Sequence, residues 1–101
     1  MKLFAKRENI NTGVEECRRT EGAVLIDVRE ADEFASGHIQ GAWNVPLSRI
    51  QIIKAPKDTP LFLYCLRGSR SLKAARILKK MGYTNVRSIG GINGYTGELV
   101  R

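Results

Sequence analysis

A cysteine followed closely by two arginines and a glycine is the part of this sequence whose residue types could do chemistry. The stretch LYCLRGSR places Cys65 at the end of an apolar run, with Arg67, Gly68 and Arg70 shortly after it. Cysteine acts as a nucleophile in its thiolate form, which neighbouring positive charges favour. Glycine can adopt a positive φ angle, so that successive backbone N–H groups of a short turn can converge on one anion. The spacing therefore predicts a reactive Cys65 held by an anion-binding loop, residues 66–70.

Cys65 has a second interpretation as an ordinary buried residue. Cysteine is among the residue types most often found in the core, and Cys65 would then be the last apolar residue of a strand. The two arginines of the loop favour the reactive interpretation, because packing alone does not need them. A metal site has little support, since the chain contains two cysteines and one histidine, none of them closely spaced. We therefore predict no metal and no cofactor.

Short apolar runs alternate with helix-like segments along the chain. The apolar runs predict strands at residues 23–28, 60–65 and 85–91, a short strand at WNVP (43–46) and an edge strand at KLFAK (2–6). The helix-like segments are residues 12–20, 30–36, 47–53 and 69–81. This alternation predicts an α/β fold with a mostly parallel central sheet and helices on both faces.

The segment that follows the loop is the clearest of the expected helices. An apolar stripe at i, i+3, i+4 and i+7 is formed by Ala74, Ile77, Leu78 and Met81. We expect Ser69 or Ser71 to cap the start of this helix and Gly82 to end it. Ligands of parallel sheets bind beyond the carboxyl ends of the strands, and the strand 60–65 delivers Cys65 to that edge.

Charge is distributed unevenly over the 101 residues, whose net charge is +7. Residues 1–33 carry 6 of the 17 basic and 8 of the 10 acidic side chains, which leaves 11 basic and 2 acidic ones for residues 34–101. No acidic residue occurs between Pro60 and Gly97. Such a positive field attracts a small oxyanion, an acidic protein or a nucleic acid. The basic stretch lacks the interleaved aromatic residues that stack on bases, which argues against nucleic acid.

The length of the chain suits one compact domain, which we assign to residues 1–101. No window approaches the roughly 20 apolar residues of a membrane span, and the basic start is not followed by the apolar region of a signal peptide. We therefore expect a monomer in the cytoplasm that does not associate with membranes.

Three motifs, in order along the chain, resemble the rhodanese-like sulfurtransferase family. The loop CLRGSR looks like the family's active-site loop, C-x-x-G-x-R. The stretch LIDVREADEFASGHIQGAWNVP is similar to the family's first signature, and GGINGY is similar to the glycine pair and short helix near its C-terminus. The resemblance covers nearly the whole chain and implies a rhodanese-like three-layer fold.

The resemblance also implies a reaction and roles for individual residues. Cys65 would take sulfane sulfur from an anionic donor such as thiosulfate, become a persulfide, and pass the sulfur to cyanide, a thiol or a protein. The loop would bind the terminal sulfur and the donor through Leu66, Arg67, Gly68, Ser69 and Arg70. Asp27 and Arg29 match the family's D-V-R sequence, and we expect them to support neighbouring loops without taking part in the chemistry.

Two other readings concern the same loop. Cysteine phosphatases and arsenate reductases use a longer loop, C-x₅-R, and the four residues between Cys65 and Arg70 argue against phosphate. The second reading is a sulfur carrier or docking module that serves one protein partner and turns over little free thiosulfate. The basic face of helix 69–81 favours this reading and points to an acidic acceptor protein.

Overall fold

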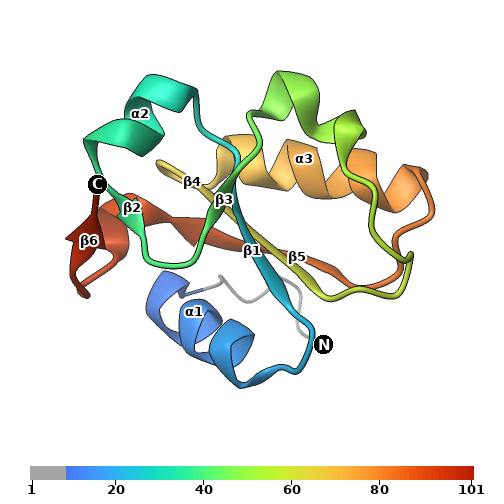
Figure 1. Ribbon diagram of the computed structural model, residues 1–101, viewed down its shortest axis with the longest axis horizontal. Coiled ribbons are helices and arrows are strands. Elements are labelled where there is room, and N and C mark those ends of the chain that lie inside the picture. Colours follow the sequence, from blue (N-terminus) through green and yellow to red (C-terminus); the bar gives the residue numbers. More distant parts are fainter. Residues whose placement is uncertain (1–8) are drawn as a thin grey trace, which may run out of the picture.

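The computed structural model describes residues 9–101, so the strand expected at 2–6 lies outside the described residues. A four-stranded sheet forms the centre, with strand order β3-β1-β4-β5 and every neighbouring pair parallel (Figure 1). Its strands are β1 (Val24–Asp27), β3 (Trp43–Asn44), β4 (Leu61–Cys65) and β5 (Val86–Gly91). The expected strands therefore form, each shorter than its apolar run.

The helices connect these strands as the alternating pattern predicts. The α-helices are α1 (Ile10–Arg19), α2 (Ala31–Ser36) and α3 (Ser69–Lys80), and the 3₁₀ helices are η1 (Leu47–Ile52) and η2 (Ile92–Gly94). A second, antiparallel pair of strands that the sequence did not indicate joins β2 (His38–Ile39) to β6 (Leu99–Val100). Within residues 9–101, no helix combines the length and the apolarity that crossing a membrane requires.

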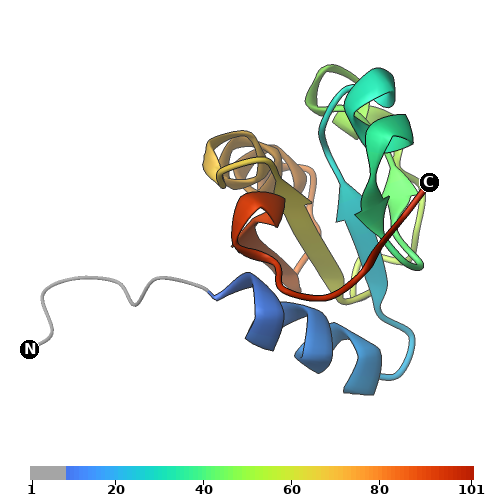
Figure 2. The ribbon, with the colours of Figure 1, turned by 90° about the vertical axis from the view of Figure 1, so that its left-hand side faces the viewer.

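Apolar side chains pack on both faces of the sheet. All five residues of β4 are buried, and their side chains alternate between the two faces. One cluster joins Leu61, Leu63 and Cys65 to α3 and η1, and the other joins Phe62 and Tyr64 to α1. Figures 1 and 2 show α1 and α3 on different sides of the sheet. The prediction of a mostly parallel sheet covered on both faces is confirmed.

Helix α3 follows the predicted apolar stripe but begins differently from the prediction. Ala74 and Leu78 are fully buried, while Ile77 and Met81 are half-buried against the same core. Gly82 follows the helix with φ of 105° and ends it as expected. At the start, the N-cap residue is Gly68 with φ of 106°, which has no side chain that could cap the helix. The expectation that Ser69 or Ser71 caps α3 is therefore wrong.

Candidate active site

The sulfur of Cys65 occupies the place that a capping oxygen takes in most helices. Cys65 ends β4 and is 1% exposed. Its Sγ accepts hydrogen bonds from Gly68 N at 2.9 Å and from Ser71 N at 3.3 Å. Ser71 is the third residue of α3, whose N–H group an N-cap side chain normally satisfies. The positive end of the α3 dipole and these donors favour a negatively charged sulfur.

Ser71 adds a hydroxyl group to this environment and was not among the predicted site residues. The residue is fully buried, and its Oγ lies 3.6 Å from Cys65 Sγ. The hydroxyl also lies within reach of the Gly68 carbonyl at 3.1 Å and of Ser88 Oγ at 2.7 Å. A thiol can donate its proton to this oxygen, and a thiolate can accept the hydroxyl proton instead. The sequence signal for Ser71 was its position in the first turn of a helix that starts at the loop.

The glycine pair at the end of β5 lies against the backbone of the loop at Leu66 and Arg67. Gly91 pairs with Cys65 in the sheet register. A Cβ atom at Gly91 would overlap the Leu66 carbonyl oxygen and would approach Arg67 Cα to 2.6 Å. Asn93 N donates a hydrogen bond to the same Leu66 carbonyl, at 3.2 Å. The glycine therefore lets the backbone of β5 lie directly against the loop.

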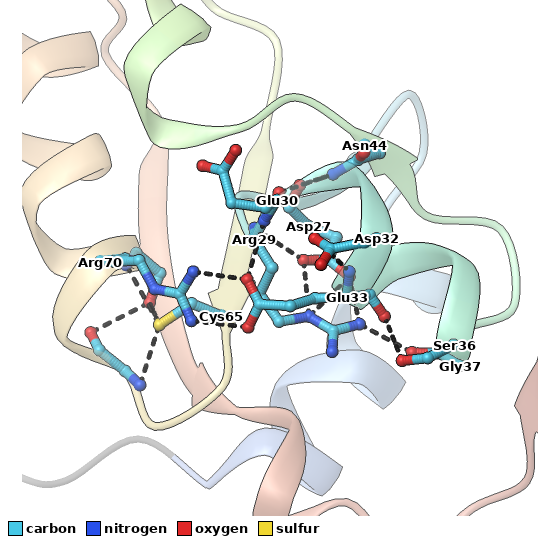
Figure 3. A network of polar contacts seen from close by, with 12 residues as sticks. Asp27, Arg29, Glu30, Asp32, Glu33, Ser36, Gly37, Asn44, Cys65 and Arg70 are labelled. Carbon is cyan, nitrogen blue, oxygen red and sulfur yellow. Dashed lines mark hydrogen bonds and ion pairs between the residues drawn. The ribbon is translucent and has the colours of Figure 1, made fainter.

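Arg70 is paired with Glu33, a residue that the sequence did not identify as part of the site. The two Nη atoms of Arg70 donate to the two carboxylate oxygens of Glu33 at 2.7 and 3.0 Å (Figure 3). These hydrogen bonds lower the pKa of Glu33 to about 2 and raise the pKa of Arg70. Arg67 is exposed and forms no ion pair with any residue in the range 9–101. The unbalanced positive charge of the loop therefore belongs to Arg67.

Asp27 and Arg29 form a buried ion pair behind Glu33 (Figure 3). Arg29 Nη2 lies 2.7 Å from Asp27 Oδ2 and donates a second hydrogen bond of 2.7 Å to the carbonyl of Gly37. Burial acts to lower the pKa of Arg29, but the hydrogen bonds and charge of Asp27 outweigh it and raise that pKa. Gly37 ends α2, the helix that carries Glu33. The ion pair therefore connects the end of β1 to α2, whose Glu33 pairs with Arg70.

Two further residues lie at the loop, and the histidine and the second cysteine lie on other elements. Leu66 and Ser69 are exposed on the loop and at the start of α3. His38 stacks on Phe34 with ring centroids 3.6 Å apart, and its Nδ1 lies 2.9 Å from the Phe34 carbonyl oxygen. Cys17 is buried on α1, and burial raises the pKa of its thiol. Because its thiol is buried in the core and its pKa is raised, we interpret Cys17 as a packing residue.

The chain matches a family model and several known proteins. Residues 12–98 match the rhodanese-like domain family. The chain is 44% identical over 80 residues to the uncharacterized protein YqhL of Bacillus subtilis, covering 76% of this chain and 64% of that protein. It is 38% identical over 78 residues to the thiosulfate sulfurtransferase GlpE of Pseudomonas putida, covering 75% and 71%. It is also 39% identical over 71 residues to the thiosulfate sulfurtransferase PspE of Escherichia coli, covering 66% and 68%.

Solved structures give the same family. A rhodanese with anions from E. coli is 32% identical, with a TM-score of 0.72 and coverage of 78% of this chain and 98% of that one. The rhodanese-like domain of the Anabaena protein Alr3790 shares the fold, with a TM-score of 0.81 at 18% identity over 96% of this chain and 80% of that one. By sequence and by fold, the chain belongs to the rhodanese-like domain family and resembles its thiosulfate sulfurtransferases.

Proposed function

We propose that this protein is a sulfurtransferase that carries sulfane sulfur from an anionic donor such as thiosulfate to a thiophilic acceptor, as a persulfide on Cys65. The observation that carries the proposal is the environment of Cys65 Sγ, which accepts two backbone N–H hydrogen bonds at the start of α3. Relatives named thiosulfate sulfurtransferase support thiosulfate as the donor.

In the first step, the thiolate of Cys65 attacks the outer sulfur of thiosulfate. A sulfur–sulfur bond to Cys65 forms, the bond between the two sulfur atoms of thiosulfate breaks, and sulfite leaves with the electron pair of that bond. The N–H donors and the positive end of the α3 dipole stabilise negative charge on the sulfur. Arg67, whose charge is unbalanced, attracts the dianionic donor to the loop.

In the second step, the acceptor attacks the terminal sulfur of the persulfide. With cyanide, a carbon–sulfur bond forms, the sulfur–sulfur bond breaks, and Cys65 leaves as the thiolate while thiocyanate is released. The N–H groups of Ser69 and Arg70 begin α3 and have no carbonyl partner within the helix. These groups can bind the extra sulfur, which lies one sulfur–sulfur bond, about 2 Å, beyond Sγ.

A carrier that serves one protein is the second candidate function. The observation that favours it is the exposed basic face of α3, which starts beside Cys65. A carrier loads sulfur in the same way but transfers it slowly to small acceptors and rapidly to its protein partner.

The intact mass of the protein after incubation with thiosulfate tests the proposed function. The native chain and Cys17→Ala should each gain one sulfur atom, and cyanide should remove it, whereas Cys65→Ala should gain none. All masses are compared without reductant. If the native chain gains no sulfur, or if Cys65→Ala gains as much as the native chain, the proposed function is wrong.

Rapid turnover of thiosulfate with cyanide would favour the enzyme over the carrier. A loaded protein that returns sulfur to cyanide only over many minutes would favour the carrier.

A further inference from the structure

The exposed face of α3 carries a row of positive charge, and the helix itself starts next to Cys65. The exposed residues of this helix after its first turn are Leu72, Lys73, Arg76, Lys79 and Lys80, which we call the α3 ridge. Their spacings of three and four residues put them on one side of the helix, opposite the buried Ala74 and Leu78. At 1.5 Å per residue, the ridge extends about 12 Å along the helix.

The charges of the α3 ridge are not balanced by neighbouring acids. None of its four cations forms an ion pair with a described residue, and no acidic residue occurs from Pro60 to Gly97. Like charges three or four positions apart on a helix destabilise it by about 0.2–0.5 kcal/mol per pair. Lys73 and Arg76, and Arg76 and Lys80, are such pairs. The fold does not need this arrangement, since the other face of α3 provides the packing.

Two exposed leucines lie close to Cys65 in the sequence, one in the loop and one in the ridge itself. Leu66 follows Cys65 and is 36% exposed, and Leu72 in the first turns of α3 is 47% exposed. Exposed leucines on the same segment as exposed cations suit a protein-binding surface, which combines apolar and charged side chains. A small anionic donor uses neither of them.

We propose that the α3 ridge and Leu66 bind an acceptor protein with an acidic surface, which presents a nucleophilic cysteine to the persulfide of Cys65. This inference rests on the proposed function and names its acceptor. The occupant is acidic because the four cations of the ridge form no ion pair within residues 9–101. It is a protein because the ridge has exposed leucine and no aromatic side chain on which bases could stack.

The transfer step balances without another reagent. The thiolate of the acceptor attacks the terminal sulfur, a new sulfur–sulfur bond forms on the acceptor, and the bond to Cys65 breaks. Cys65 leaves as the thiolate, and the acceptor becomes the persulfide.

Two short cysteine peptides test the surface. Each contains one cysteine and one leucine, and they differ only in carrying four glutamates or four lysines. The protein is first loaded with sulfur, and the rate of transfer to each peptide is followed by mass spectrometry at low salt. We expect transfer to the acidic peptide to be about tenfold faster or more, because charge complementarity raises association rates.

Two charge-reversal variants separate the ridge from the net charge of the protein. Lys73→Glu with Arg76→Glu changes the ridge, and Arg18→Glu with Arg19→Glu makes the same change in net charge on α1, on the other side of the sheet. The ridge variant should lose most of the preference for the acidic peptide, about tenfold, and the α1 variant should keep it. Transfer from both loaded variants to 2-mercaptoethanol, whose reacting thiolate carries a single negative charge, should stay within about twofold of the native rate.

The docking proposal is wrong if the two peptides react equally fast, or if both variants lose the preference to the same extent. It is also wrong if a fluorescent oligouridine binds the ridge while the glutamates give no advantage, which would indicate a nucleic-acid site. Binding of the acidic peptide with serine in place of cysteine, measured by fluorescence anisotropy, needs no sulfur chemistry. Loss of loading with retained, ridge-dependent binding would therefore overturn the proposed function and leave the docking surface supported.

Discussion

At the scale of single residues, the sulfur of Cys65 is both the nucleophile of the proposed reaction and a helix-capping group. Gly68 makes this possible, because its positive φ angle turns the chain sharply enough for Gly68 N and Ser71 N to point at the same sulfur. The loop that binds sulfur is therefore also the loop that starts α3. A thiolate satisfies these donors better than a thiol, since hydrogen bonds to a charged acceptor are about twice as strong.

Ser71 rather than Ser69 is the serine that should matter for sulfur loading. Ser71 Oγ lies 3.6 Å from Cys65 Sγ, whereas Ser69 is exposed. A hydrogen bond of good geometry to a charged group contributes about 1.5–3 kcal/mol, which corresponds to about tenfold to a hundredfold in rate. The contact of Ser71 with Cys65 is long, at 3.6 Å, so that its loss should cost less. We expect Ser71→Ala to slow loading by thiosulfate about three- to tenfold and Ser69→Ala to slow it less than twofold. The measurement is the loading rate by intact mass.

Thermal unfolding of both variants provides the control for folding. Equal loading rates for Ser71→Ala and the native chain, with both folded, would contradict this role of Ser71. A larger effect of Ser69→Ala would return the donor-binding role to Ser69, as the sequence suggested.

At the scale of elements, α2 connects the end of β1 to the loop 66–70 and supports it. Its end is held by Arg29 through the carbonyl of Gly37, and its Glu33 holds Arg70. Arg70 is the last residue of the loop and lies in the first turn of α3, so displacement of α2 would move the start of α3. Asp27 and Arg29 thus affect the loop through α2, without contact to the sulfur.

Replacement of Glu33 by glutamine should lower stability in a manner that depends on pH. At pH 7 Glu33 is ionised in both the folded and the unfolded chain, so its ion pair contributes fully. As the pH falls from about 4.5 to about 2, the unfolded chain binds a proton that the folded chain does not, and the contribution is lost. We expect Glu33→Gln to reduce the free energy of unfolding by about 1 kcal/mol at pH 7 and by less at pH 3.

Urea denaturation at the two pH values measures this difference. Glu15→Gln is the matched control, because Glu15 is exposed on α1 and lies 3.9 Å from Arg19 in a weak ion pair. Its effect should be close to zero at both pH values. A Glu33→Gln variant that is as stable as the native chain at pH 7 would show that the ion pair of Glu33 with Arg70 contributes nothing to the free energy of unfolding.

The sequence predicted elements with a clear local pattern and missed contacts between distant segments. The apolar stripe of α3 and the apolar run of β4 are local signals, and both elements form. The pairing of β2 with β6 involves two residues on each strand, too few for an alternating pattern. Glu33 and Arg70 are 37 residues apart, so that only the folded chain brings them together. The sequence therefore predicted that Arg70 binds the sulfur donor, and it did not predict the ion pair of Arg70 with Glu33.

At the scale of the whole molecule, the distribution of charge matches the position of the site. The part of the chain without acidic residues includes the loop and the whole of α3. Two acidic side chains from residues 1–33 pair with this part, Glu33 with Arg70 and Glu16 with Arg87. A field of one sign around a small site concentrates ions of the opposite sign. The single domain 1–101, the monomeric state and the cytoplasmic location stay predictions.

The rate of loading by thiosulfate should therefore depend strongly on ionic strength. The donor is a dianion and the protein carries a net charge of +7. Electrostatic interactions reach about 30 Å at 0.01 M salt but only about 8 Å at physiological salt, so that much of the attraction is lost between these conditions. We expect the second-order rate constant for loading to fall about fivefold or more over this range. Neutral iodoacetamide provides the comparison, because its alkylation by the Cys65 thiolate, located by peptide mass mapping, involves no attraction between ions. A loading rate that changes with salt no more than the alkylation rate would mean that the positive field does not guide the donor, and that the cations of α3 act on a partner alone.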